Sequence, residues 1–265
     1  MNRRKSLLII ITTLLLIFSI SAQAQDMDVY QKKLYLNQGD TLPYRIMYPP
    51  DFDETGKYPL LLFLHGAGER GNDNEKQLIH GASLFADPTN RKDYPAIVVF
   101  PQCPEGDWWA RIKDSEDADG KRIFTFNSKG SPNPAMRLVL RLLDELVKAA
   151  YIDADRVYLG GLSMGGMGTF DLLTLRPKTF AAAFPICGGG NPRKARKISR
   201  VTSFWIFHGA EDEVVDPRYS EIMAEALEKH KGKVKLTIYP GTGHNSWDNA
   251  FAEPELLPWV FSNRR

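Results

Sequence analysis

The stretch of sequence that decides the fold reads VYLGGLSMGG and runs from Val157 to Gly166. An apolar strand is followed by a glycine-rich turn around Ser163, and a helical pattern then extends over Met164–Leu175. Gly161, Ser163 and Gly165 fit G-x-S-x-G, a pattern that places a serine on a tight strand-to-helix turn. Side chains two residues before and after the serine would collide in such a turn, so glycines occupy both places. The stretch therefore predicts an exposed serine hydroxyl at a strand end, next to the N-terminus of a helix.

Apolar runs on both sides of this stretch predict the rest of a sheet. Unbroken apolar runs are typical of strands that are covered on both faces. They lie at Leu60–Leu64, Ile97–Phe100, Val157–Leu159, Ala181–Ile186 and Phe204–Phe207, and the last expected strand is Val234–Tyr239. Nearer the start, Val29–Leu36 and Thr41–Tyr48 flank the turn residues Asn37–Asp40 and predict an antiparallel hairpin.

Helical spacing of apolar residues fills most gaps between these runs. Asn133 and Pro134 are suited to the N-cap and first position of the first helix. The expected helices are Met136–Ala149, Met164–Leu175, Tyr219–Lys229 and Pro254–Phe261. An antiparallel start followed by strand–helix alternation predicts an α/β fold with a mostly parallel, eight-stranded sheet flanked by helices.

The segment Asp107–Ser131 interrupts this alternation because it is long, polar and rich in Gly, Asp, Ser and Lys. Segments of this length without regular structure are usually functional or disordered. It follows the C-terminal end of a strand, the side on which open α/β sheets bind ligands. We therefore expect a loop beside the binding site, and whether it acts as a lid stays open.

The first 24 residues have the layout of a cleavable secretory signal. Three basic residues within Arg3–Lys5 precede the apolar run Leu7–Ile20, and Ala22-Gln23-Ala24 supplies small residues at the cleavage site. The alternative, an uncleaved anchor, needs roughly 18–20 apolar residues, more than this run offers. We predict a signal at 1–24, one domain at 25–265, and a secreted or periplasmic protein without stable membrane insertion.

Net charge and cysteine content limit the binding partners and covalent links that we expect. Loss of the three signal cations takes the formal net charge from +2 to −1. A near-neutral protein has no electrostatic reason to bind nucleic acid or an anionic membrane. Cys103 and Cys187 could pair in an oxidising compartment. Their expected strands need not be neighbours, so pairing is open but not favoured.

A serine hydroxyl needs a positioned base to act as a nucleophile, and three histidines follow Ser163 at useful distances. His230 lies among lysines at an expected helix end, which suits a solvated surface residue. His208 ends an expected strand and suits a structural role. His244 lies in a glycine-rich loop after the last strand, where a base can reach over the serine. We predict His244 as the base.

The acid that would orient this base follows the penultimate strand, where the chain order serine, acid, histidine places it. Asp212 is the first choice because it lies close enough to the strand end to be held rigidly. Glu211, Glu213 and Asp216 are the neighbouring candidates, and Asp216 before Pro217 looks like a helix cap. Its task would be to accept the imidazole N–H and stabilise the imidazolium.

The loop His65–Gly71 directly follows the strand Leu60–Leu64. In this arrangement the loop supplies one backbone N–H to an oxyanion and the residue after the nucleophile supplies another, which names Ala67 and Met164. A phosphate-binding loop is disfavoured because the Gly-Lys-Ser/Thr ending is missing.

Three tryptophans stand on polar loops near these residues: Trp108, Trp109 and Trp247. Each could form an apolar or sugar-stacking wall of the substrate pocket. Each could equally fasten its loop to the body of the protein. The sequence leaves both alternatives open.

Together the motifs resemble the phospholipase/carboxylesterase and feruloyl-esterase-like branch of the α/β hydrolases, some members of which are named predicted peptidases. The matching stretches are Leu64–Gly71, Pro101–Pro104, Gly161–Gly166, His208–Asp212 and Gly243–His244. The resemblance implies an α/β-hydrolase fold and an acyl-enzyme mechanism with the Ser, Asp and His named above, without a metal or other cofactor. Related hydrolases with Cys at the turn are disfavoured by Ser163.

We therefore expect a serine carboxylic-ester hydrolase that removes feruloyl or acetyl groups from polysaccharide or small esters. One alternative is a serine peptidase or aminoacyl hydrolase. Another is an inactive carbohydrate-binding relative, against which the intact Ser163, Asp212 and His244 argue.

Overall fold

The computed structural model describes residues 27–127 and 129–265. The predicted signal at 1–24 lies outside the described residues, so its cleavage and the domain boundary at 25 stay predictions. Among the described residues, no helix is long and apolar enough to cross a membrane.

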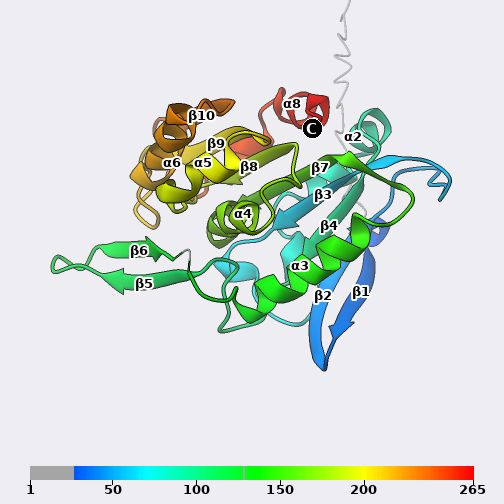
Figure 1. Ribbon diagram of the computed structural model, residues 1–265, viewed down its shortest axis with the longest axis horizontal. Coiled ribbons are helices and arrows are strands. Elements are labelled where there is room, and N and C mark those ends of the chain that lie inside the picture. Colours follow the sequence, from blue (N-terminus) through cyan, green and yellow to red (C-terminus); the bar gives the residue numbers. More distant parts are fainter. Residues whose placement is uncertain (1–26, 128) are drawn as a thin grey trace, which may run out of the picture.

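The body of the protein is an eight-stranded mixed sheet (Figure 1). Its strands are β1 (Gln31–Asn37), β2 (Asp40–Met47), β3 (Tyr58–Leu64), β4 (Ile97–Pro101), β7 (Ile152–Leu162), β8 (Ala182–Ile186), β9 (Ser203–Gly209) and β10 (Val234–Tyr239). The spatial order is β1-β2-β4-β3-β7-β8-β9-β10. Only β1 with β2 and β2 with β4 pair antiparallel, which confirms the predicted mostly parallel sheet with an antiparallel start.

Helices cover both faces of this sheet. One cluster of buried side chains joins the sheet to α3 (Pro134–Leu146), α4 (Met164–Leu175), α5 (Ala195–Ile198) and α6 (Arg218–Lys229). The other joins the opposite face to α1 (Ala82–Ala86), α7 (Trp247–Phe251) and α8 (Leu256–Ser262), and α2 (Pro88–Asp93) follows α1. Four short 3-10 turns complete the chain: η1 (Met27–Val29), η2 (Ala67–Glu69), η3 (Lys76–Leu78) and η4 (Pro192–Lys194).

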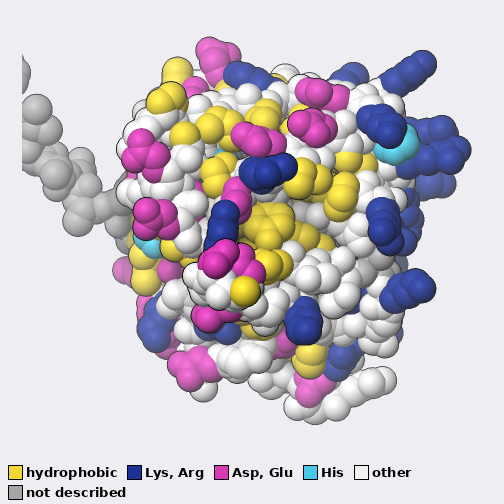
Figure 2. Space-filling view, turned by 90° about the vertical axis from the view of Figure 1, so that its left-hand side faces the viewer, with side chains coloured by type: hydrophobic (Ala, Val, Ile, Leu, Met, Phe, Trp, Pro, Cys, Tyr) yellow, Lys and Arg dark blue, Asp and Glu magenta, His cyan; other side chains and the backbone are white. Residues whose placement is uncertain are grey.

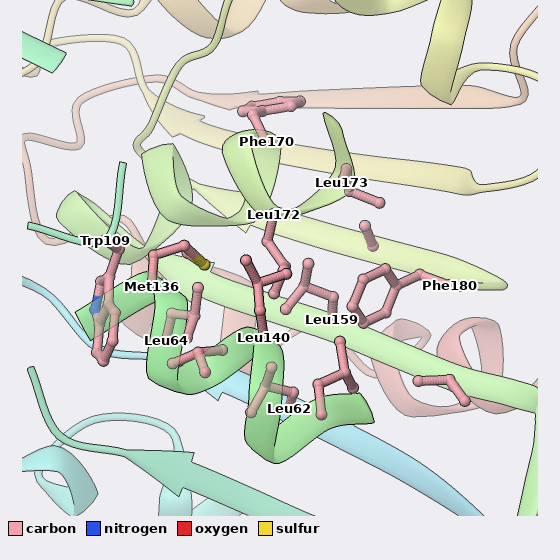
Figure 3. Packing of buried hydrophobic residues seen from close by; sticks show 14 of the residues in the cluster. Leu62, Leu64, Trp109, Met136, Leu140, Leu159, Phe170, Leu172, Leu173 and Phe180 are labelled. Atoms are coloured by element: carbon pink, nitrogen blue, oxygen red, sulfur yellow. The ribbon is translucent and has the colours of Figure 1, made fainter. Parts of the chain in front are cut away.

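The central strands are buried on both faces of the sheet, because their alternate side chains pack into the two different clusters. In β7, Leu159 packs on the α3–α4 side and Tyr158 packs on the opposite side. Figure 3 shows the first of these layers, with Leu62 and Leu159 from the sheet meeting Leu140 and Leu172 from α3 and α4. This two-sided burial explains why the parallel strands lack polar alternation in the sequence.

The expected loop at 107–131 instead contains a two-stranded hairpin, β5 (Ile112–Glu116) and β6 (Arg122–Phe126). It projects from the body at the left of Figure 1. The prediction of a segment without regular structure was therefore wrong for its middle part. Most side chains of the hairpin are exposed, so its strands carry polar residues in place of the apolar runs that signal buried strands.

Smaller differences concern element ends. The first strand begins at Gln31, two residues after the expected start, because Val29 belongs to η1. Pro134 is the first residue of α3 as predicted, but Asn133 makes no capping bond. Its side-chain amide donates instead to the carbonyl oxygens of Trp108 and Ala110, at 3.0 Å each.

Both cysteines are buried free thiols, so the possible disulfide is absent.

Candidate active site

Ser163 occupies the sharp turn between β7 and α4, with φ 52° and ψ −115°. This left-handed conformation is strained for a residue with a side chain. A Cβ atom on Gly161 would overlap the carbonyl oxygen of Gly165, and one on Gly165 would overlap that of Leu64. The two glycines thus let the start of α4 lie directly against the turn and against the end of β3, as the G-x-S-x-G pattern predicts.

His244 reaches Ser163 from the loop after β10. Its Nε2 lies 2.9 Å from the Ser163 Oγ, and its Nδ1 lies 2.7 Å from the Asp212 Oδ2. A carboxylate oxygen only accepts hydrogen bonds, so Nδ1 carries the proton. Nε2 is then left with a lone pair that accepts the serine proton, which is the arrangement that a general base requires.

Asp212 follows β9 and its side chain is inaccessible to solvent. Burial alone would raise the pKa of this carboxyl, but hydrogen bonds from His208, His244 and the Val215 backbone outweigh burial. The net result is a pKa held well below the usual range. Asp212 therefore stays negatively charged beside the Nδ1 of His244.

His208 also contacts the carboxylate of Asp212, a contact that sequence reasoning missed. Its Nε2 lies 3.1 Å from the Asp212 Oδ2 and 2.9 Å from the Val215 carbonyl oxygen. Its Nδ1 lies 2.7 Å from the Ser220 Oγ. His208 therefore has a structural role, as expected: its ring holds the Asp212 carboxylate in place. The short i,i+4 spacing between His208 and Asp212 was the available signal.

The other candidate base and acid, His230 and Asp216, make different contacts. His230 is the C-cap residue of α6. Asp216 accepts a hydrogen bond from the Arg218 N–H at the start of α6, as a cap would, and forms an ion pair with Lys121 of the hairpin.

Ala67 and Met164 are the first residues of η2 and α4. N–H groups in the first turn of a helix have no partner within that helix and are therefore available to an oxyanion. Arg70 braces the loop, since its Nε donates to the Ala67 carbonyl oxygen at 3.0 Å. Glu69 does not pair with Arg70; its carboxylate lies 3.6 Å from the His80 Nε2.

The three tryptophans have different environments. Trp109 is fully buried and donates from Nε1 to the His65 carbonyl oxygen at 3.0 Å, so it fastens the loop and cannot line a pocket. Its assignment to substrate binding was therefore wrong; Figure 3 shows it packed beside Met136. Trp108 is half-buried beneath the Arg70 guanidinium, which lies 5.3 Å from its ring centre. Trp247 is half-buried with its ring centre 5.4 Å from that of His244.

Within the described residues, one group of side chains has the spacing of metal ligands: Cys187, Asp212 and His244, with donor atoms within 4.8 Å of one another. Two of these side chains form the hydrogen-bonded chain to Ser163. Burial raises the pKa of the Cys187 thiol far above its usual range, so the thiol is protonated. The arrangement favours proton transfer, and the absence of a cofactor stays a prediction.

A serine on a strand-to-helix turn, an acid after the penultimate strand and a histidine after the last strand define an α/β hydrolase. The sequence profile of the Phospholipase/Carboxylesterase family matches residues 53–253, and the chain belongs to this family. The resemblance seen in the sequence is thereby confirmed.

Three similar proteins illustrate this relationship. The bifunctional acetylxylan esterase/xylanase XynS20E of Neocallimastix patriciarum is 30% identical over 158 residues, which are 60% of this chain and 20% of that protein. A thermostable esterase of known crystal structure is 33% identical, with a TM-score of 0.79 over 90% of this chain and 64% of the other. The feruloyl esterase module from Clostridium thermocellum, solved with sinapinate, is 20% identical with a TM-score of 0.60 over 88% and 87%, and shows the fold alone. The chain thus spans about a fifth of the first of these relatives.

Proposed function

We propose that this chain hydrolyses carboxylic esters through an acyl-enzyme on Ser163. One observation carries the proposal: an unbroken chain of contacts runs from the Ser163 Oγ through both nitrogens of His244 to the Asp212 carboxylate, at 2.9 and 2.7 Å. Such a chain activates an otherwise weak nucleophile. Membership of the Phospholipase/Carboxylesterase family supports the choice of an ester as substrate.

In the first half of the reaction the Ser163 Oγ attacks the ester carbonyl carbon while the His244 Nε2 takes the hydroxyl proton. The backbone N–H groups of Ala67 and Met164 donate to the oxyanion that forms. The imidazolium then protonates the departing alcohol oxygen as the carbon–oxygen bond breaks. The acyl group remains attached to Ser163.

The second half reverses these roles. His244 removes a proton from water, the resulting hydroxide attacks the acyl carbon, and the Ser163 Oγ leaves with the proton held by the imidazolium. The free acid is released. In both halves the buried charge of Asp212 stabilises the imidazolium that forms 2.7 Å away.

For the substrate we propose feruloyl- or acetyl-type acyl groups on polysaccharide or small esters. The names of two similar proteins, an acetylxylan esterase and a feruloyl esterase, support this choice. Trp247, half-buried with its ring centre 5.4 Å from that of His244, offers aromatic surface to such a group, and Trp108 is half-buried beside Arg70 of the loop that carries Ala67. Trp109 contributes no surface because it is fully buried.

We also propose export, on the basis of the basic residues, apolar run and Ala22-Gln23-Ala24 at the start of the chain. Mass spectrometry of the protein from the periplasm and the medium should find Gln25 as the first residue. Recovery of the intact chain in the cytoplasm alone would contradict export.

A fluorophosphonate probe tests the nucleophile directly because it labels activated serines. We expect labelling of the unchanged protein, none of Ser163→Ala, and normal labelling of Ser262→Ala, which removes an exposed hydroxyl on α8. Labelling that persists in Ser163→Ala would refute the nucleophile. An unlabelled but folded native protein would favour the inactive carbohydrate-binding alternative.

A substrate panel then tests the reaction class. p-Nitrophenyl esters, methyl ferulate and acetylated xylan should be turned over, whereas peptide anilides should not. Hydrolysis of anilides alone would replace the esterase proposal with the peptidase alternative. Among the esters, the ranking of kcat/KM identifies the preferred acyl group.

A further inference from the structure

Two short runs of the sequence concentrate positive charge. Arg193–Arg200 holds five Lys or Arg among eight residues, Lys229–Lys235 holds four among seven, and neither run contains an acid. Over the whole chain 34 basic residues nearly balance 32 acidic ones, so this charge is local. We call the outer face of the two runs the basic surface. Its cations are Arg193, Lys194, Arg196, Lys197, Arg200, Lys229, Lys231 and Lys233. Lys235 does not belong to it, because its Nζ lies 3.5 Å from the centre of the Trp205 ring on the other face of the sheet.

The fold brings the two runs side by side. The first run spans η4 and α5, which both pack against α6, and the second begins in the last residue of α6. Ser199 contacts the second run twice, with its Oγ 3.4 Å from the His230 carbonyl oxygen and its Cβ close to Gly232. Lys and Arg side chains gather along the right-hand margin of the face shown in Figure 2.

None of these cations forms an ion pair with a described carboxylate. The ion pairs found between described residues all involve other cations. Seven of the eight are exposed and Lys194 is half-buried. Cations crowded in this way create a local positive potential that attracts a polyanion even when the net charge is near zero.

A groove of about 680 Å³ adjoins the basic surface, between the β5–β6 hairpin and η4. Its volume lies within the range of ordinary ligand sites. Aromatic, amide and cationic side chains line it, among them Phe124, Phe126, Asn127, Lys129, Asn191 and Arg193. Because Arg193 belongs to both, the groove and the basic surface are continuous.

The other side of the groove leads toward Ser163. Gly190 and Asn191 line it, and both follow β8 on the edge of the sheet that carries Ser163. Gly188, two residues earlier, packs against the backbone of Gly166 in the first turn of α4. An extended polymer could therefore contact the basic surface, cross the groove and present a group near Ser163.

We propose that the basic surface and the groove together bind an acidic polysaccharide, a chain of carboxylate-bearing sugars. The carboxylates complement the cations, and a sugar ring packs on the aromatic face of the half-buried Phe126. The choice of a polysaccharide rests on the proposed function, because such polymers carry carboxylic esters whereas nucleic acids are phosphodiesters. A membrane is disfavoured because none of the exposed large apolar side chains among the described residues lies in either run.

The test measures binding without catalysis, so that it is independent of the proposed esterase activity. The full chain carrying Ser163→Ala is titrated into end-labelled oligogalacturonate, and fluorescence anisotropy gives Kd. Neutral xylo-oligosaccharide, single-stranded DNA of equal charge and anionic phosphatidylglycerol vesicles are compared at the same salt concentration. We expect oligogalacturonate to bind most tightly, with an affinity that falls as the logarithm of the salt concentration rises.

A charge-removing variant locates the site. Arg196→Gln, Arg200→Gln, Lys231→Gln and Lys233→Gln together remove four exposed cations. We expect this variant to bind oligogalacturonate roughly 10- to 100-fold more weakly. As a matched control, Lys33→Gln, Lys92→Gln, Arg141→Gln and Lys148→Gln also remove four exposed cations, from β1, from α2, from α3 and just after α3, and should change Kd less than about twofold. Thermal melting confirms that both variants fold.

Three results would overturn the inference. Equal weakening by the two variants would mean that only overall charge matters. Binding that persists unchanged at about 0.5 M salt would exclude an electrostatic surface. Tighter binding of DNA or vesicles than of oligogalacturonate would assign the basic surface to that other partner. This test never measures hydrolysis, so its result can be interpreted even if the ester assays fail.

Discussion

The Ser163 edge of the sheet and the β5–β6 hairpin differ in how their residues are held. Around Ser163 the neighbouring residues of β7 and α4 are buried, and glycines allow backbone to touch backbone. In the hairpin strands only Phe124 is buried. The hairpin is attached by a small apolar cluster around Phe124 and by a few polar contacts, such as the Phe124 N–H with the Tyr219 hydroxyl at 3.0 Å and the Lys121–Asp216 ion pair.

The difference shows that the two regions should respond differently to change. At the Ser163 edge the backbone and side chains are closely packed, so small substitutions should have large effects on rate or stability. In the hairpin most side chains face solvent, so substitutions should have small effects on folding. The following predictions test this contrast, from the largest expected effect to the smallest.

The largest effect should follow Asp212→Asn. An amide can donate to His244 and so stabilise the wrong tautomer, in which Nε2 carries the proton and cannot accept one from Ser163. In proteases with the same three residues this change lowers kcat by about 10⁴, and we expect about 10³–10⁴ here. Ester turnover at saturating substrate measures it.

Asp216→Asn is the matched control, because Asp216 belongs to the same loop but contacts Arg218 and Lys121 instead. Its kcat should stay within about twofold of the unchanged protein. If both variants lost the same activity, Asp212 would have no special relation to His244.

Trp109→Ala should cost about 3–5 kcal/mol in the free energy of unfolding, since it removes a fully buried indole and its hydrogen bond to His65. Trp247→Ala removes a half-buried indole and should cost no more than about 1–2 kcal/mol. Urea denaturation followed by circular dichroism measures both. Equal costs would contradict the assignment of Trp109 as the buried fastener of its loop.

His65 gives the Ser163 edge a pH dependence of stability. Burial lowers the pKa of His65 from 6.5 to about 4, so the folded protein holds the ring neutral while the unfolded chain protonates it. The unfolded state binds more protons below pH 6.5, and stability therefore falls as pH drops from 6.5 toward 4. The loss should approach about 3 kcal/mol and should shrink in His65→Gln.

Denaturant titrations at steps of pH give this slope, and the ring signals of His65 give an independent check by NMR. Asp212 does not interfere in this window, because a carboxyl with a depressed pKa loses its contribution only below the unfolded value of 3.8. A His65 ring that titrates near pH 6.5 in the folded protein would refute the prediction.

The smallest effect belongs to the hairpin. Arg122 and Asp114 form an ion pair across β5 and β6, with side chains 40% and 32% exposed. Replacing Arg122 by Gln should change the free energy of unfolding by less than about 1 kcal/mol, because exposed pairs contribute little. Thermal unfolding of the variant is the measurement, and a loss as large as that of Trp109→Ala would abolish the contrast between the two regions.

Much of the fold could be predicted from the sequence where burial shapes the residue pattern. The bounds of α4 and β10 match the structure at both ends, α4 because the glycine turn marks its start and β10 because apolar residues alternate with Lys235 and Thr237. The contacts among Ser163, Asp212 and His244 follow from their positions after the ends of β7, β9 and β10. The hairpin escaped prediction because its strands are mostly exposed and contain no long apolar run.

Other features depend on packing that a linear pattern does not encode. Trp108 and Trp109 are adjacent, yet one is half-buried and the other fully buried. Their order in the chain gives no sign of which side chain enters the core. The basic surface was hidden in the near-zero net charge, because charge totals carry no information about where the side chains gather.

The contacts of Asp212 determine how much freedom that carboxylate retains. A carboxylate offers about four lone-pair positions. Oδ1 accepts from the Val214 and Val215 N–H groups at 2.9 Å each, and Oδ2 faces His208 at 3.1 Å and His244 at 2.7 Å. No acceptor position is left for a solvent molecule, so the carboxylate cannot rotate or rehydrate without breaking one of these bonds. During a turnover cycle, the motion that accompanies proton transfer must therefore come from the imidazole of His244, the Ser163 side chain and the substrate, and not from this carboxylate.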